Sequence, residues 1–150
     1  MGGTSGAIYS LMFTSIHASV LEHSQKNNLK DDTTEIVKFW CQALKHAMDT
    51  ITKYSWAEVG DRTMLESLHA AYKCLNGFVK CGPCNEQTEV LASKVSGAVL
   101  TAAEGTATMA AKAGRASYVD SARVDQPDPG AIGVACWMNA IATFLTHRRK

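Results

Sequence analysis

The chain has 150 residues, which is enough for one domain with a substantial hydrophobic core. It is 46% apolar and 19% charged, a composition typical of soluble globular proteins, and its formal net charge is +1. A chain so close to neutral has no basic field for nucleic acid or for an anionic membrane, so we expect neither as a partner.

No segment is predicted to direct the chain out of the cytoplasm. The longest apolar stretch, residues 131–145, contains Asn139 and is too short to span a bilayer. The N-terminus lacks the basic region of a secretory signal, and the five cysteines are an odd number, which argues for reduced thiols. We therefore expect a cytoplasmic protein.

Apolar residues at helical spacing predict an all-α protein, and no stretch alternates with period two for long enough to predict a strand. Each apolar stripe is expected to face the core, and short connections favour an antiparallel bundle of about five helices. In chain order the predicted helices cover residues 5–22, 34–54, 64–80, 86–112 and 131–147. The fourth becomes small and polar towards its end, and a long polar loop without regular structure is predicted over residues 113–126.

The pair Cys81 and Cys84, separated by Gly82-Pro83, has the spacing of a redox site. A thioredoxin-like site needs a strand before it and a helix opening at the first cysteine. Here a helical pattern runs into Cys81 and the Gly-Pro step breaks it, and no second pair completes a zinc tetrad. We predict a loop that connects two helices, with no role for the thiols.

Three predicted helix starts carry glycine, at residues 2–6, 60–63 and 128–130. Glycine lets an anion approach the backbone N–H groups and the positive dipole end of a helix. The forked guanidinium of Arg115, in the loop before the last helix, can reach the same anion. A phosphate-bearing ligand at one end of the bundle is one interpretation, and ordinary caps and turns without a ligand are the other.

The second and third of these starts also have good capping residues. Thr63 and Glu66 have the spacing of a capping box. Asp128 is a favourable N-cap, and Pro129 suits the first helical position. These residues predict where the helices begin whether or not a ligand binds.

In their order along the chain, these motifs resemble the nucleotide-binding L domain of dihydroxyacetone kinases. The sequence Asp-Gln-Pro-Asp-Pro-Gly at residues 125–130 most resembles that of the animal single-chain branch, the triokinase/FMN cyclases. The resemblance covers Gly2-Gly3-Thr4-Ser5-Gly6-Ala7-Ile8-Tyr9, Gly60-Asp61-Arg62-Thr63-Met64-Leu65, Gly114-Arg115-Ala116-Ser117-Tyr118 and Asp128-Pro129-Gly130-Ala131. It implies an antiparallel helical barrel with a nucleotide at one mouth, of which residues 1–150 would form the C-terminal part of an eight-helix domain.

The resemblance also implies a set of nucleotide-binding residues and no catalytic residue in this chain. Phosphates would be contacted by Thr4, Ser5 and Arg115. Met64 would line the adenine pocket, and Ser55 stands where bacterial members have a glycine beside the nucleotide. The site would be closed by Asp128, Pro129 and Gly130.

The cofactors implied are ATP or ADP, with Mg²⁺ in the complete domain. Family members hold Mg²⁺ with three aspartates spaced Asp-x4-Asp-x-Asp before the first glycine motif, which here places the triad upstream of Met1. No aspartates in this chain have that spacing. We therefore predict no metal ligand in this chain and expect a fragment, a truncated gene model or an unusual short isoform. The dihydroxyacetone-binding K domain, which uses a histidine, would be a missing partner, and the full-length protein is expected to be a homodimer.

These features favour the interpretation that the chain is part of an ATP-dependent dihydroxyacetone or glyceraldehyde kinase. The resemblance adds FAD-AMP lyase activity as a further function of that protein. By itself the chain would bind nucleotide weakly and be inactive. One alternative is a non-catalytic helical interaction module, because a barrel short of helices exposes its apolar lining. Another is the ADP-binding subunit of a phosphotransferase-linked kinase, although residues 122–127 depart from that branch.

Overall fold

The computed structural model describes residues 3–26, 33–81, 88–113, 115–118 and 126–147. All regular structure in these ranges is helical, which confirms the all-α prediction. The elements are α1 (Gly3–Lys26), α2 (Thr33–Ser55), α3 (Met64–Cys81), α4 (Thr88–Gly105), the 3₁₀ turns η1 (Thr106–Thr108) and η2 (Arg115–Tyr118), and α5 (Pro129–His147).

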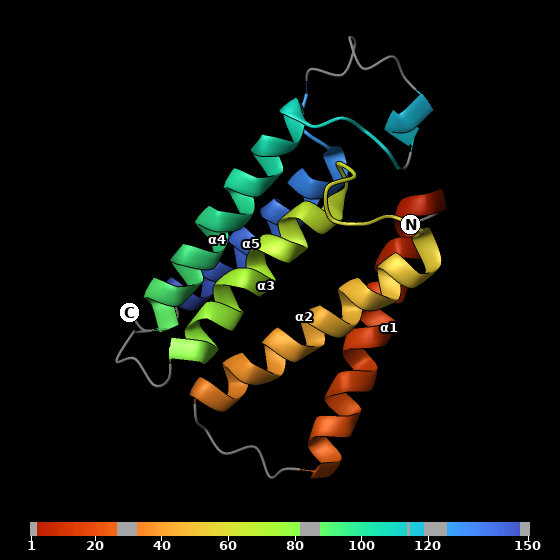
Figure 1. The fold of residues 1–150 in the computed structure, drawn as a ribbon. Coiled ribbons are helices and arrows are strands. Elements are labelled where there is room, and N and C mark those ends of the chain that lie inside the picture. The colour runs from red at the N-terminus through yellow and green to blue at the C-terminus, as the bar shows by residue number, and fades with distance from the viewer. Residues whose placement is uncertain (1–2, 27–32, 82–87, 114, 119–125, 148–150) are drawn as a thin grey trace.

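Successive helices run in opposite directions, so α1, α3 and α5 begin at the end of the bundle where α2 and α4 finish (Figure 1). Helices α3, α4 and α5 pack against one another, α2 packs on α3, and α1 packs mainly on α2. The short connections from α1 to α4 favour this antiparallel order, as predicted, and α5 continues it after a longer segment. Its consequence is that the three glycine-bearing helix starts gather at one end.

The main core forms along the apolar face of α3 and the helices that surround it. Leu65, Leu68 and Ala71 recur at a spacing of three residues and are at most 1% exposed. They meet fully buried side chains of the neighbouring helices, among them Val99 of α4 and Val134 of α5. A helix with neighbours on several sides is thus held mainly by burial of its apolar face.

The predicted end of the fourth helix is wrong, because α4 stops at Gly105 rather than at residue 112. The Thr106 hydroxyl donates to the carbonyl of Ala103 at 2.6 Å, and the Thr106 carbonyl accepts from the Met109 amide at 3.1 Å. These local bonds replace the helical pattern with a 3₁₀ turn, and Met109 is extended. The loop predicted over residues 113–126 also contains a 3₁₀ turn, η2.

Several side chains predicted to lie in the core are exposed instead. These side chains lie on α1, α2 and α5. Among the described residues, α1 packs mainly on α2, so part of the apolar stripe of α1 stays exposed. The exposed members of the predicted stripes are Val20, Ile36, Trp40, Ile141 and Phe144.

Helix α5, 19 residues long, is long and apolar enough to cross a membrane by length and composition alone, which corrects the expectation from residues 131–145. In the structure it packs on α3 and α4. Its Ala131, Val134 and Ala135 are buried in the main core. One face of α5 thus joins the main core, while 28% of its apolar window is buried in all.

Cys41 is expected to react with iodoacetamide much more slowly than Cys136. Cys41 is buried, and burial raises the pKa of its thiol despite the opposing charge of Lys80, whereas Cys136 is exposed. A raised pKa leaves less thiolate at pH 7–8, so the difference should narrow as the pH rises. Mass spectrometry of timed alkylation checks this, and equal rates at the two sites would contradict it.

Helix α3 ends at Cys81, where the sequence predicted the break. Cys84 lies outside the described residues.

Candidate functional site

The three glycine-bearing helix starts lie at one end of the bundle, together with the loop of residues 56–63 and the turns η1 and η2 (Figure 1). The contacts of each start decide which predicted site residues meet.

The start of α3 is the predicted capping box. The Thr63 hydroxyl accepts from the Leu65 amide at 3.1 Å, and Glu66 Oε1 accepts from the Thr63 amide at 3.2 Å. The second oxygen of Glu66 accepts from the Gly60 amide at 3.0 Å, so this buried carboxylate fixes the preceding turn as well. Gly60 has φ +107°, a backbone conformation that favours glycine. The prediction is confirmed, and the turn before α3 is rigidly tied to the helix.

The start of α5 is capped as predicted by Asp128. Its Oδ2 accepts from the Ala131 amide at 2.8 Å and its carbonyl accepts from the Ile132 amide at 3.0 Å. Pro129 is the first helical residue. These bonds satisfy donors of the first turn that the helix itself leaves unpaired.

The starts of α3 and α5 pack directly on each other. A Cβ added to Gly130 would lie 3.4 Å from Met64 Cβ and 2.9 Å from Asp128 Oδ2. One turn further on, the buried Ser67 hydroxyl of α3 donates to the Ala131 carbonyl at 3.0 Å. Only a residue without a side chain fits at position 130 without a shift in its neighbours.

The structure therefore brings together four of the predicted site residues, Met64, Asp128, Pro129 and Gly130. Met64 is buried, whereas Pro129 is exposed. Ser5 and Ser55 lie at the same end, in the first turn of α1 and at the end of α2, but outside this packed group. Ser55 is half-buried, and its hydroxyl accepts from the Ala57 amide at 3.3 Å.

The other two predicted residues are placed by backbone alone. Thr4 lies in the first turn of α1 and Arg115 opens η2. Their side chains lie outside the described part of the structure, as do Gly114 and residues 119–125. The predicted phosphate contacts of Thr4 and Arg115 stay predictions.

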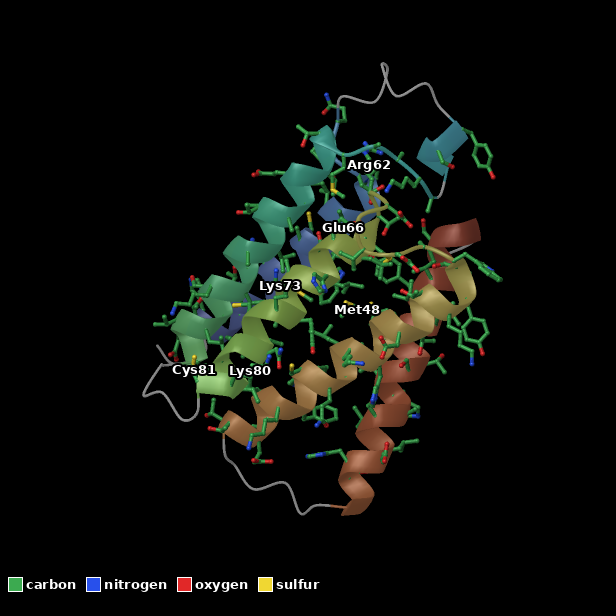
Figure 2. The ribbon with its side chains drawn as sticks, viewed as in Figure 1. Met48, Arg62, Glu66, Lys73, Lys80 and Cys81 are labelled. Carbon is green, nitrogen blue, oxygen red and sulfur yellow. The ribbon has the colours of Figure 1, made fainter. Side chains whose placement is uncertain are left out.

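Arg62 is the residue at this end to which the sequence motifs gave no role. It is 3% exposed, has φ +63°, and lies in the turn before α3 (Figure 2). Its Nε donates to the Thr106 carbonyl at 3.0 Å and its Nη2 to the Gln126 carbonyl at 2.6 Å. A charged residue in a polar turn is expected to face solvent, so no local pattern in the sequence indicates that Arg62 is buried.

Across residues 3–26, 33–81, 88–113, 115–118 and 126–147, no group of three or more His, Cys, Asp or Glu side chains is arranged to hold a metal ion. The acidic residues near the candidate site bind backbone amides instead. Asp61 accepts from Glu58, Glu66 from Gly60 and Thr63, and Asp128 from Ala131.

The metal-binding aspartates of the family were expected upstream of Met1. Met1 itself lies outside the described residues. The position of that triad stays a prediction, and within the described residues Asp61 and Asp128 accept from backbone amides.

Comparison with known protein families assigns this helical domain to a class. The DAK2 domain family matches residues 1–143, and the chain belongs to that family. The resemblance to dihydroxyacetone kinases is thereby confirmed at the level of the family.

Named relatives agree with this assignment. The chain is 40% identical over 145 residues to the triokinase/FMN cyclases of Bos taurus and Homo sapiens, a match that covers 97% of this chain and 23% of each relative. It is 38% identical over 152 residues to dihydroxyacetone kinase 1 of Saccharomyces cerevisiae, covering 97% of this chain and 22% of that protein. The chain thus spans less than a quarter of the length of these relatives.

Proposed function

We propose that this chain is the nucleotide-binding part of a kinase that transfers the γ-phosphate of ATP to dihydroxyacetone or glyceraldehyde. The observation that carries the proposal is the close packing of the α3 and α5 starts through Gly130 and Met64 in a DAK2 domain. The names of the relatives, triokinase/FMN cyclase and dihydroxyacetone kinase, support the substrate class.

The proposed chemistry needs positioning and charge neutralisation more than covalent participation by the protein. The first turns of α1 and α5 would offer N–H groups to phosphate oxygens, with the hydroxyls of Thr4 and Ser5 as further donors. The Asp128 cap already uses the Ala131 amide, so the Gly130 amide would bind the phosphates. Arg115 would add a charge-assisted bond.

The remaining assignments complete the proposal. Met64, buried beneath Gly130, would form the edge of the adenine pocket, with Ser55 on the α2 side. Mg²⁺ would accompany the nucleotide and neutralise the charge on the transferring phosphoryl group. The full-length protein would be a cytoplasmic homodimer that works with a dihydroxyacetone-binding K domain. The resemblance to the triokinase/FMN cyclases makes FAD a second proposed substrate of the same site.

An assay of dihydroxyacetone phosphorylation with Mg·ATP tests the proposal. We expect turnover by the full-length protein with a K domain present and none by residues 1–150 alone. Absence of activity in the first preparation would contradict the proposed function, and turnover by the 150 residues alone would contradict their proposed dependence on the K domain.

Arg115→Ala in the full-length protein is expected to raise the KM for nucleotide or to lower kcat. Loss of a hydrogen bond to a charged group costs about 1.5–3 kcal/mol, which corresponds to roughly a 10- to 150-fold loss in kcat/KM. Steady-state kinetics measure it, with Lys45→Ala as a control that removes an exposed cation paired with Asp49 on α2. Unchanged kinetics for Arg115→Ala would remove Arg115 from the site.

A second candidate function, a helical interaction module, rests on the exposed apolar side chains at the edges of the bundle. Phe13 on α1 and Phe144 on α5 are each 60% exposed, and Ile141 is 52% exposed. Exposed apolar surface of this kind favours association. Light scattering during size exclusion distinguishes the candidates, because a monomer that binds no hydrophobic dye would count against the interaction module.

A further inference from the structure

Arg62 joins three segments that are far apart in the sequence. The turn before α3 carries its backbone, and its guanidinium bonds to carbonyls 44 and 64 residues further along the chain, at Thr106 and Gln126. Thr106 directly follows the last residue of α4, where the helix dipole favours a cation. A positive φ for a residue with a long side chain is unfavourable, so the surrounding contacts must hold this conformation.

The segment before α5 is held at two points by this arrangement. Arg62 Nη2 binds the Gln126 carbonyl at 2.6 Å. Two residues later, the Asp128 amide donates to the Thr106 hydroxyl at 2.7 Å. Arg62 also binds the Thr106 carbonyl at 3.0 Å. Its guanidinium therefore holds both Gln126 and Thr106, and Thr106 in turn binds the Asp128 amide.

Asp128 is the N-cap of α5, so these bonds set the position of the first turn of that helix. The same turn contains Gly130, whose close approach to Met64 leaves little room for a shift. The Lys112 amide also donates to the Asp61 carbonyl at 3.2 Å, which ties the segment leading to η2 to the turn that carries Arg62. The turn of residues 60–63 is therefore bonded to the segments before and after the loop that contains Arg115.

We propose that Arg62 is a positioning residue of the nucleotide site. It does not touch the nucleotide; its forked guanidinium holds residues 126–128 and the end of α4 so that the first turn of α5 faces the phosphates. This inference rests on the proposed function. Lysine has a single compact ammonium group, so it cannot reproduce bonds from Nε and Nη2 to two separate carbonyls.

The experiment compares Arg62→Lys with Lys73→Met in the full-length protein, and the second change removes an exposed cation of α3 (Figure 2). ADP affinity by calorimetry, kcat, the two KM values and the melting temperature are measured. We expect Arg62→Lys to weaken ADP binding and raise the KM for ATP by about tenfold or more, with the KM for the triose unchanged. Lys73→Met should leave all of these unchanged.

A second pair of variants keeps the proposal testable if Arg62→Lys does not fold. Thr106→Val removes the acceptor of the Asp128 amide, and Thr106→Ser restores it. Thr106→Val should reproduce the weaker ADP binding, and Thr106→Ser should bind as the unaltered protein does. If Arg62→Lys folds, a lower melting temperature with unchanged ADP affinity would overturn the positioning role. If Arg62→Lys does not fold, the same result for Thr106→Val would overturn it. Failure of the unaltered protein to bind ADP would instead contradict the proposed function.

Discussion

Gly130→Ala is expected to destabilise the protein by about 1–3 kcal/mol and to weaken nucleotide binding, because the added methyl group enters a filled space. Its Cβ would lie 2.9 Å from Asp128 Oδ2 and 3.4 Å from Met64 Cβ. If the carboxylate moves away, the Ala131 amide loses its cap, which costs about 0.5–2 kcal/mol. If α5 moves instead, its first turn shifts relative to α3, where the phosphates are proposed to bind.

Chemical denaturation and ADP titration of the same variant measure the two effects. Gly77→Ala is the matched control, because Gly77 lies within α3 and a Cβ there meets nothing within 4 Å. That control should gain about 0.5–1 kcal/mol from helix propensity and bind ADP unchanged. A Gly130→Ala protein as stable as Gly77→Ala would show that the two helix starts are not packed as described.

Leu68→Ala is expected to lower the free energy of unfolding by about 2–5 kcal/mol. Leu68 is fully buried in α3, where the main core has neighbours from several helices. The cavity left by the substitution cannot collapse without moving α3, which also carries Met64 and the capping box. Calorimetry should show a decrease in melting temperature of about 5–15 °C.

Leu100→Ala on α4 is the control for this change, because Leu100 is 48% exposed. Its cost should stay below about 1 kcal/mol, since little apolar surface leaves the core. Similar losses for the two variants would contradict the placement of the core along α3.

Local patterns in the sequence were sufficient to predict the helices and two of their caps. The hydroxyl of Thr63, the carboxylate of Glu66 and the side chain of Asp128 bind amides two or three residues away, so their spacing alone specifies the bonds. The apolar spacing of α3 likewise predicted a core face that is buried in the structure.

Features that depend on distant segments could not be predicted in this way. The burial of Arg62 depends on carbonyls at residues 106 and 126. The end of α4 was missed for a different reason, because it depends on a local hydroxyl bond of Thr106 that apolar spacing does not reveal. Exposure of Trp40 and Ile141 depends on which neighbours α2 and α5 have, and periodicity does not reveal neighbours. The nucleotide roles of Thr4, Ser5 and Arg115 came from the resemblance of motifs, and they stay predictions.

The proposed nucleotide site lies at the end of the bundle where α1, α3 and α5 begin. An NMR titration of residues 1–150 with ADP tests it most directly, because even a dissociation constant of about 1 mM, or −4.1 kcal/mol, shifts amide signals measurably. We predict shifts in the first turn of α1, in residues 60–66 and in residues 128–131, with the far ends of the helices unaffected. Saturating shifts confined to another part of the bundle, or none at millimolar ADP, would contradict the account.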